Sequence, residues 1–557
     1  MSARNGTVLL LALSTLTLLV GCGSSNNTTV VTPPPSGSFS NSDLSGTYVF
    51  SVSGTDFAGA PYAIVGTFMA NGSGGNGRGG ITGGTIDIND VEFTPVFGVA
   101  INNSGYYSVG QDGRGQMTIG TPSGQNPFGE NMTFDFVLSS SSHGLITEFD
   151  NNGTGSGTID AQTAGLTQAS LTGTYAFSFS GVDGNFNPLA TVGNFNILDS
   201  SGDISGLEDF NDADLAYPNF SLSGSLTLGP QTTPSTVLST GAFQGLTFDV
   251  YAIDATHLKF IESDDVEFLS GDAYSQTSTT IPSETLAFTL DGFFPFSGDS
   301  SIPAAAGGFM VADGAGGITN ASTEDVNDGG TPSTAPVTFT ADYTAQGAGR
   351  YVLSGFSGFF GGTEYVAYPY SNGLFLLELD DAGIMAGAAY TQSPTIPTFA
   401  SAEGYGLSLT GDNLTNGVEV DDIAEFTAAS GGTISSGIID ENADPNGSEF
   451  GAPFYGLPLT NGLYNGPDAS GRYGLAVDAG NSNVTTLNGG LGLTFYAVDG
   501  TNFPFIETDN GGQVSTGVLV LQTPSSATPV VAKPRALFTR PLIRAHGDFK
   551  KRTQAAK

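Results

Sequence analysis

Two short acidic motifs recur four times along this 557-residue chain, and their carboxylates are the groups best suited to chemistry. The first motif is Glu-x-Asp, which on a strand would place both carboxylates on one face, with the aspartate entering the following turn. Its copies are Glu148 and Asp150, Glu262 and Asp264, Glu378 and Asp380, and Glu507 and Asp509. A buried carboxylate needs a partner or a raised pKa, and either can mark a binding site. The structural alternative is a glutamate bonded to a tyrosine or to backbone N–H groups, beside a turn capped by the aspartate.

The second motif is Asp-x-Asn, which offers the oxygen ligands that calcium prefers. Its copies are Asp87 and Asn89, Asp209 and Asn211, Asp325 and Asn327, and Asp440 and Asn442. None continues into the twelve-residue loop with a closing glutamate that an EF-hand requires. We therefore expect no cofactor, with turn capping as the role of these residues and calcium binding as the alternative.

Other catalytic arrangements are missing from the sequence. His143 and His257 each precede a Glu-x-Asp motif by five residues, but Gly373 and Asn502 occupy that position in the other copies, which is typical of a turn rather than a general base. With one cysteine and no histidine cluster, we expect no transition-metal site. Two carboxylates would suffice for a glycosidase, but the chain has no tryptophan to form a sugar platform, and we expect no enzyme activity.

The elements that would position these acids are β-strands. In residues 46–54 the side chains of Tyr48, Phe50 and Val52 alternate with polar residues between flanking glycines, with Val49 as the exception, and this pattern predicts a half-buried strand. Short turns rich in Gly, Asn and Asp favour antiparallel neighbours. The first repeat predicts strands at 47–53, 62–69, 81–88, 106–109, 116–120, 132–138, 145–149 and 157–160, with 93–101 as a ninth. We predict an all-β fold in which each repeat is an up-and-down barrel of roughly eight strands, with a β-sandwich as the alternative.

The two acidic motifs and the alternating strand recur in the same order four times, which divides the chain into tandem modules. Each module is large enough to form its own hydrophobic core. The predicted parts are a signal peptide at 1–21, a lipidated cysteine and Ser/Pro-rich stalk at 22–43, β modules at 44–163, 170–277, 284–393 and 400–523, and a basic, disordered tail at 524–557.

The first residues carry an export signal. Arg4 precedes an apolar run from Val8 to Val20, too short for a stable membrane span, and Leu19-Val20-Gly21-Cys22 follows the pattern of a lipobox. This ending resembles bacterial lipoproteins, in which the cysteine becomes the lipid-modified N-terminus. The whole pattern resembles uncharacterised repeat-containing bacterial lipoproteins, which implies attachment to the outer membrane through Cys22, with surface exposure, but implies no activity.

The charge of the chain is segregated. Between residues 23 and 532 there are 52 acidic residues and five basic ones, whereas residues 533–557 carry eight basic residues and one acid. Such an acidic body repels phosphate backbones, so nucleic acid is excluded as a partner. We expect a structural or adhesive protein whose four modules bind polysaccharide or other envelope polymers weakly and multivalently. The alternative is a carrier with a small apolar ligand inside each barrel.

Overall fold

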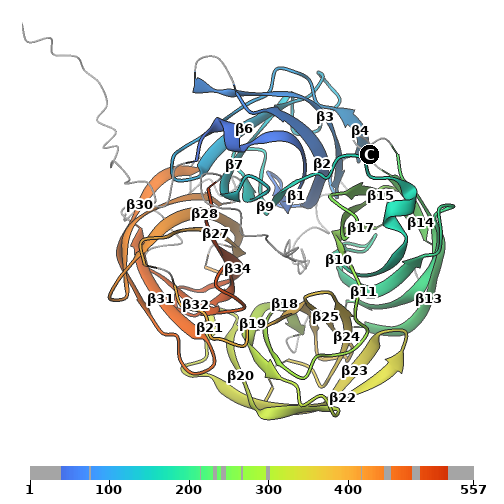
Figure 1. Ribbon diagram of the computed structural model, residues 1–557, viewed down its shortest axis with the longest axis vertical. Coiled ribbons are helices and arrows are strands. Elements are labelled where there is room, and N and C mark those ends of the chain that lie inside the picture. Colours follow the sequence, from blue (N-terminus) through green and yellow to red (C-terminus); the bar gives the residue numbers. More distant parts are fainter. Residues whose placement is uncertain are drawn as a thin grey trace, which may run out of the picture. The chain divides into compact units, whose positions relative to one another are not determined.

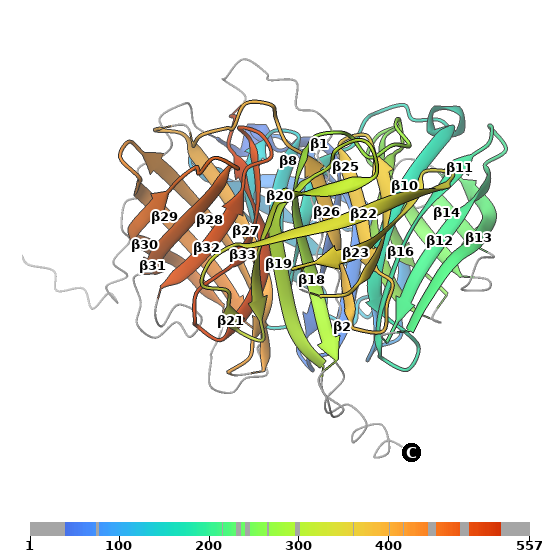
Figure 2. The same ribbon diagram turned by 90° about the horizontal axis from the view of Figure 1, so that it is seen from below.

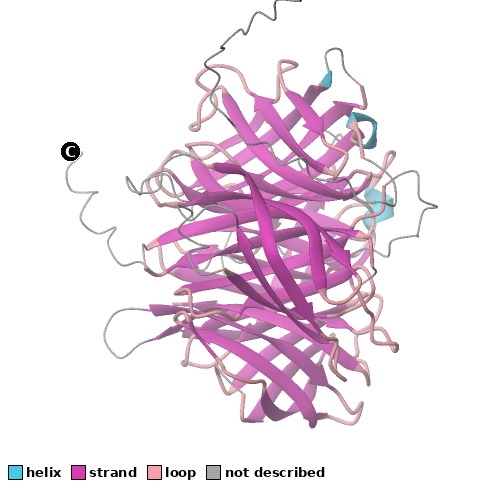
Figure 3. Ribbon diagram, turned by 90° about the vertical axis from the view of Figure 1, so that its left-hand side faces the viewer, coloured by secondary structure: helices cyan, strands magenta, loops and turns pink. Residues whose placement is uncertain are grey.

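The computed structural model is almost entirely β-strand (Figure 3). It describes residues 39–73, 77–213, 215–229, 235–239, 246–264, 267–295, 301–359, 361–399, 401–415, 417–443, 453–479 and 490–524. Helical structure within these ranges includes two short 3-10 turns, Asn41–Asp43 (η1) and Gln168–Leu171 (η3). None of their helices is long and apolar enough to cross a membrane. The signal peptide, Cys22, the stalk up to residue 38 and the tail from residue 525 lie outside the described residues.

The strands fall into four consecutive modules, which the colours of Figure 1 follow from blue to red. Module 1 contains β1 (Ser45–Asp56), β2 (Pro61–Asn71), β3 (Gly79–Asp90), β4 (Val96–Ala100), β5 (Tyr106–Val109), β6 (Arg114–Gly120), β7 (Asn131–Ser140), β8 (His143–Glu148) and β9 (Gly153–Ala161). Module 2 contains β10 (Gly173–Val182), β11 (Pro188–Ile197), β12 (Asp203–Asp212), β13 (Leu215–Thr227), β14 (Ser235–Ser239), β15 (Thr247–Ala252), β16 (His257–Glu262) and β17 (Phe268–Ser275).

The second half of the chain repeats this arrangement. Module 3 contains β18 (Thr285–Pro295), β19 (Ser301–Val311), β20 (Gly317–Asp328), β21 (Thr331–Pro332), β22 (Val337–Gly347), β23 (Arg350–Ser357), β24 (Glu364–Tyr370), β25 (Gly373–Glu378) and β26 (Ile384–Thr391). Module 4 contains β27 (Gly404–Asn413), β28 (Val418–Ala429), β29 (Thr433–Ala443), β30 (Phe454–Asn465), β31 (Arg472–Ala479), β32 (Leu491–Tyr496), β33 (Asn502–Glu507) and β34 (Gln513–Leu521).

Each module is an antiparallel barrel, which confirms the predicted fold over the sandwich. Modules 2 and 4 are closed barrels in simple sequence order. In modules 1 and 3 the pairings β2–β3 and β19–β20 join the two ends of the sheet, leaving β4 and β21 as additional strands. The tilted, twisted strands of the barrels are visible from below in Figure 2. Closure removes the exposed sheet edges that an open meander would leave.

Alternate side chains along a strand point to the interior of the barrel and to its outside, where they can contact a neighbouring module. Tyr48, Phe50 and Val52 lie in the core of module 1, where Phe50 packs edge-on against Phe68 at 5.8 Å between ring centroids. Burying such a side chain contributes about 1.5–3 kcal/mol. Val49, the exception to the alternation, points the other way and packs against Tyr251 and Ile261 of module 2. The outward apolar residues are therefore part of the contacts between modules.

Candidate functional site: the acidic motifs at the module joints

The asparagines of the Asp-x-Asn motifs lie at the ends of strands and reach into the next module. Each donates from Nδ2 to the backbone oxygen of the glutamate in that module's Glu-x-Asp motif. The four pairs are Asn89 to Glu262 (3.0 Å), Asn211 to Glu378 (3.1 Å), Asn327 to Glu507 (3.1 Å) and Asn442 to Glu148 (2.7 Å). The fourth pair returns from module 4 to module 1, so the contacts form a closed cycle of four joints, named here 1–2, 2–3, 3–4 and 4–1. The described residues all belong to one compact unit.

The aspartates of the same motifs bind cationic or phenolic groups of the next module. Asp209 accepts from Arg350 Nε at 2.8 Å, and Asp440 accepts from Arg114 Nε at 3.1 Å. At joint 1–2 the partner of Asp87 is instead the hydroxyl of Tyr251, at 2.7 Å. The motifs therefore sit inside β3, β12, β20 and β29 and join modules, which corrects the expectation that they cap turns.

The aspartates also hold a bulge in their own module. Asp87, Asp209 and Asp440 accept the backbone N–H of Gly98 (2.5 Å), Asn219 (2.8 Å) and Gly456 (2.6 Å), respectively. These three donors have φ values of 65°, 63° and 73°, a left-handed conformation that glycine and asparagine adopt at least cost. One carboxylate thus fixes both the local strand irregularity and the neighbouring module.

The aspartates of the Glu-x-Asp motifs fasten the turn after the strand to the neighbouring strand. Each accepts a backbone N–H from the residue seventeen positions earlier. The donors are Thr133 for Asp150, Thr247 for Asp264, Thr363 for Asp380 and Gly492 for Asp509. Among the described residues, no group of three or more His, Cys, Asp or Glu side chains is arranged to hold a metal ion. The expectation that the acidic motifs bind no calcium stays a prediction, and the Discussion gives its measurement.

The glutamates of these motifs are buried at strand ends, where their carboxyl groups are removed from water. Tyr62 donates its hydroxyl to Glu148, whose pKa is raised well above its ordinary value by burial and by the charge of Asp150. Burial likewise raises the pKa of Glu262 to about 9, although Asn89 donates to its Oε2 at 2.8 Å. Burial of this kind favours the protonated carboxylic acid. The contact from Tyr62 to Glu148 is of the kind that the structural alternative describes.

A set of glutamines, each directly after the last strand of its module, also crosses the joints. Each donates from Nε2 to a backbone oxygen of the next module. The pairs are Gln162 to Ala252 (2.8 Å), Gln276 to Pro369 (2.7 Å), Gln392 to Ala497 (2.8 Å) and Gln522 to Leu138 (3.0 Å). Their constant position after the last strand was the signal that would have identified them.

Four of the five cations in the acidic body lie at the joints. Arg114, Arg350 and Arg472 each begin a strand and pair with the motif aspartate of the preceding module. Lys259 of module 2 is 1% exposed and binds Asp272 at 3.0 Å. Arg78, the fifth, is exposed and lies 4.2 Å from the ring centroid of Tyr106. The sequence analysis counted these cations without giving them a role, and the structure places most of them at the joints.

The two histidines of the body are joint residues as well. His143 and His257 begin β8 and β16, directly after turns, and bind Asp160 and Asp272 at 2.7 Å each. The charges of His143, Lys259 and His257 hold the pKa of Asp160 below its ordinary range despite its burial. Since Lys259 and His257 belong to module 2, this charge cluster spans joint 1–2.

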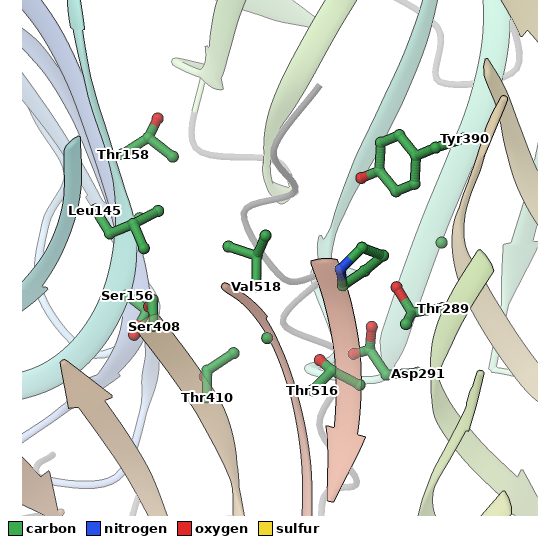
Figure 4. A pocket seen from close by; sticks show the side chains of 14 residues that line it. Leu145, Ser156, Thr158, Thr289, Asp291, Tyr390, Ser408, Thr410, Thr516 and Val518 are labelled. Atoms are coloured by element: carbon green, nitrogen blue, oxygen red, sulfur yellow. The ribbon is translucent and has the colours of Figure 1, made fainter. Parts of the chain in front are cut away.

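Two small cavities bear on ligand binding. One, of about 30 Å³, lies inside the barrel of module 2 among Phe177, Phe248 and other apolar side chains, with Thr191 and Glu208 on its wall. That volume is far below the roughly 150 Å³ of an apolar cavity that accepts benzene. The other, of about 50 Å³, is lined by modules 1, 3 and 4 and carries hydroxyl groups from Thr158, Thr289 and neighbouring residues (Figure 4).

These contacts define the class of protein: a repeat protein of four antiparallel barrels whose walls are joined by recurring polar interactions. No family model and no curated protein matches the chain. A solved structure of transferrin binding protein B from Neisseria meningitidis serogroup B is similar at 11% identity and a TM-score of 0.21, over 68% of this chain and 84% of that one. Transferrin binding protein B from Haemophilus parasuis matches at 10% identity and a TM-score of 0.17, over 70% and 86%. Likenesses with such low TM-scores carry no argument about this chain.

Proposed function

We propose that this protein is exported, anchored to the outer membrane by lipid on Cys22, and displays its four barrels as one rigid, non-enzymatic envelope unit. The apolar run up to Val20 and the sequence Gly21-Cys22 support the anchor. The Ser- and Pro-rich segment that follows suits a spacer between the membrane and the body. The single observation that supports the rigid unit is the contact from the motif asparagine to the backbone oxygen of the motif glutamate, which recurs at all four joints.

The finer proposal is that the displayed modules bind polysaccharide or another envelope polymer weakly and multivalently. Rigid joints keep equivalent surfaces at fixed spacing. A repeating polymer that is bound to one module can therefore bind the next with a smaller loss of orientational entropy. The acidic body favours neutral or cationic segments of such a polymer over anionic ones.

The second candidate, a carrier of small apolar molecules, draws support from one observation. The cavity of module 2 is lined by Phe177, Phe179, Phe248 and Phe260, which are suitable for an apolar guest. Its volume of about 30 Å³ would have to grow several-fold before a fatty acid or flavonoid could enter.

The experiment compares the mature chain from Gly23 with a variant carrying Asn211→Ala and Arg350→Met, in which joint 2–3 is weakened. Glycan arrays and co-sedimentation with insoluble polysaccharides measure binding. We expect polymer binding by the wild type and a loss of about tenfold or more in avidity for the variant, with short oligosaccharides bound equally by both. Failure to bind any polymer, together with stoichiometric uptake of a fatty acid or flavonoid, would replace this proposal with the carrier.

A further inference from the structure

Joint 1–2 departs from the other three in its electrostatics. Module 2 contains no arginine, so Asp87 has no guanidinium opposite it, whereas the equivalent aspartates of the other joints each have one. Asp87 faces β15, where Asp249 and Tyr251 are two residues apart and therefore share a face. Tyr251 donates to Asp87 at 2.7 Å, and the carboxyl group of Asp249 lies near enough to raise the pKa of Asp87.

The cation of this joint lies elsewhere on the same face. Lys259 of β16 is paired directly across from Tyr251, but its ammonium group binds Asp272 of β17 at 3.0 Å. His257 binds the same carboxylate at 2.7 Å. The positive charge is therefore committed to Asp272 and to nearby Asp160, not to Asp87.

From this arrangement we propose that joint 1–2 is a proton-dependent latch: Asp87 and Asp249 share a proton when modules 1 and 2 are closed, and the joint opens when both carboxylates are ionised. The device differs from the proposed display function, which needs only that the joints be closed. Two carboxylates in contact cannot both ionise at low cost, whereas one neutral and one ionised carboxyl group form a strong hydrogen bond.

The pH window follows from the burial of Asp87, whose side chain is 0% exposed. Burial, with Asp249 as the next cause, raises the pKa of Asp87 to about 7. In an opened joint water would return this pKa to its ordinary value near 4. Between about pH 4 and pH 7 the closed joint holds a proton that the open joint releases, so rising pH favours opening across this window. Asp160 and Asp272 have lowered pKa values and lose their charge only in stronger acid, outside the window.

The test measures the distance between modules at two pH values. Spin labels are placed on cysteines introduced at Thr82 and Ser221, both exposed, in the mature chain from Gly23, which has no other cysteine. A matched pair at Ser221 and Thr338 reports joint 2–3, where Arg350 binds Asp209. Electron–electron double resonance is recorded at pH 5 and pH 8. We expect the 82–221 distance distribution to shift to longer values at pH 8 and the 221–338 distribution to stay unchanged.

The substitution Asp87→Asn tests whether opening of the joint depends on ionisation of Asp87. Asparagine keeps an acceptor for the N–H of Gly98 and cannot ionise, so the variant should remain closed at both pH values. Asp249→Asn, which removes the second charge, should have the same effect and serves as an independent variant. A wild-type 82–221 distribution that is identical at pH 5 and pH 8 overturns the latch, as does a shift that persists in both variants. An equal shift at joint 2–3 would also overturn it, by assigning the change to the whole body.

Discussion

Arg472 at the start of β31 donates from Nε and Nη2 to the two carboxylate oxygens of Asp325 in β20, at 2.7 and 2.8 Å. Tyr496 donates to the same carboxylate at 3.1 Å. Asp325 is 2% exposed, so the guanidinium compensates a charge that would otherwise be buried alone. The two residues belong to different modules, and equivalent arginines lie at joints 2–3 and 4–1.

Removing one partner of this pair should lower the free energy of unfolding more than removing both. Arg472→Met leaves Asp325 buried without a cation and should lower the free energy of unfolding by about 3 kcal/mol. Arg472→Met combined with Asp325→Asn should recover a large part of that loss. Urea unfolding of the wild type, both single variants and the double variant measures the coupling. Arg78→Met, which removes an exposed cation outside the joints, is the control and should change stability by at most about 1 kcal/mol. Additive effects of the two joint substitutions would show that the pair is not coupled.

Mild acid should stabilise the body. Burial raises the pKa of Asp90 to about 7 and that of Glu425 to about 8. A carboxyl group whose folded-state pKa is raised destabilises the fold once the unfolded chain ionises, so stability falls as pH rises from about 4 through these values. We expect a higher melting temperature at pH 5 than at pH 8. Sodium chloride at 1 M should close only the part of the gap due to exposed charges, since buried groups are screened little. A melting temperature that rises toward pH 8 would contradict the direction of these shifts.

Calcium should stabilise the body no more than sodium chloride of matched ionic strength. The aspartates Asp150, Asp264 and Asp509 already accept backbone N–H groups at 2.5–2.8 Å, which satisfies oxygens that a calcium ion would need. Calorimetry with millimolar calcium, with and without chelator, makes the comparison. A markedly larger rise with calcium would assign the acidic motifs to cation binding.

Cys22 should carry the lipid. Replacing Cys22 with alanine, or inhibiting the lipoprotein signal peptidase with globomycin, should leave an unprocessed or unlipidated protein in cells that otherwise produce the anchored form. Metabolic labelling with a fatty-acid analogue and membrane fractionation follow the outcome. Normal processing and membrane retention of Cys22→Ala would refute lipidation.

The barrels could be predicted from the sequence, whereas the joints could not. Alternation of Tyr48, Phe50 and Val52 is a local signal, and the strand predicted at 47–53 is the central part of β1. The joint partners are separated by 147 residues for Arg472 and Asp325 and by 326 for Arg114 and Asp440, and no local periodicity encodes such pairings. The recurrence of Asp-x-Asn was visible, but its assignment to turns rested on propensity, which tertiary contacts override. The few cations of the acidic body were the available clue to the joints, because a buried carboxylate requires a cation or another partner nearby.

The measurement that tests the account most directly is the closure of joint 4–1. There Thr523 donates its backbone N–H to Ser139 O at 2.6 Å, and Gln522 donates to Leu138 O. In the mature chain from Gly23, cysteines at positions 139 and 523 should be joined by a short bismaleimide within one monomer, as should a matched pair at Ser275 and Ser371 of joint 2–3, whose hydroxyls are 3.1 Å apart. Intramolecular cross-linking of both pairs with similar yield is the predicted result. Cross-linking of 275 with 371 but not of 139 with 523 would contradict the closed cycle of joints.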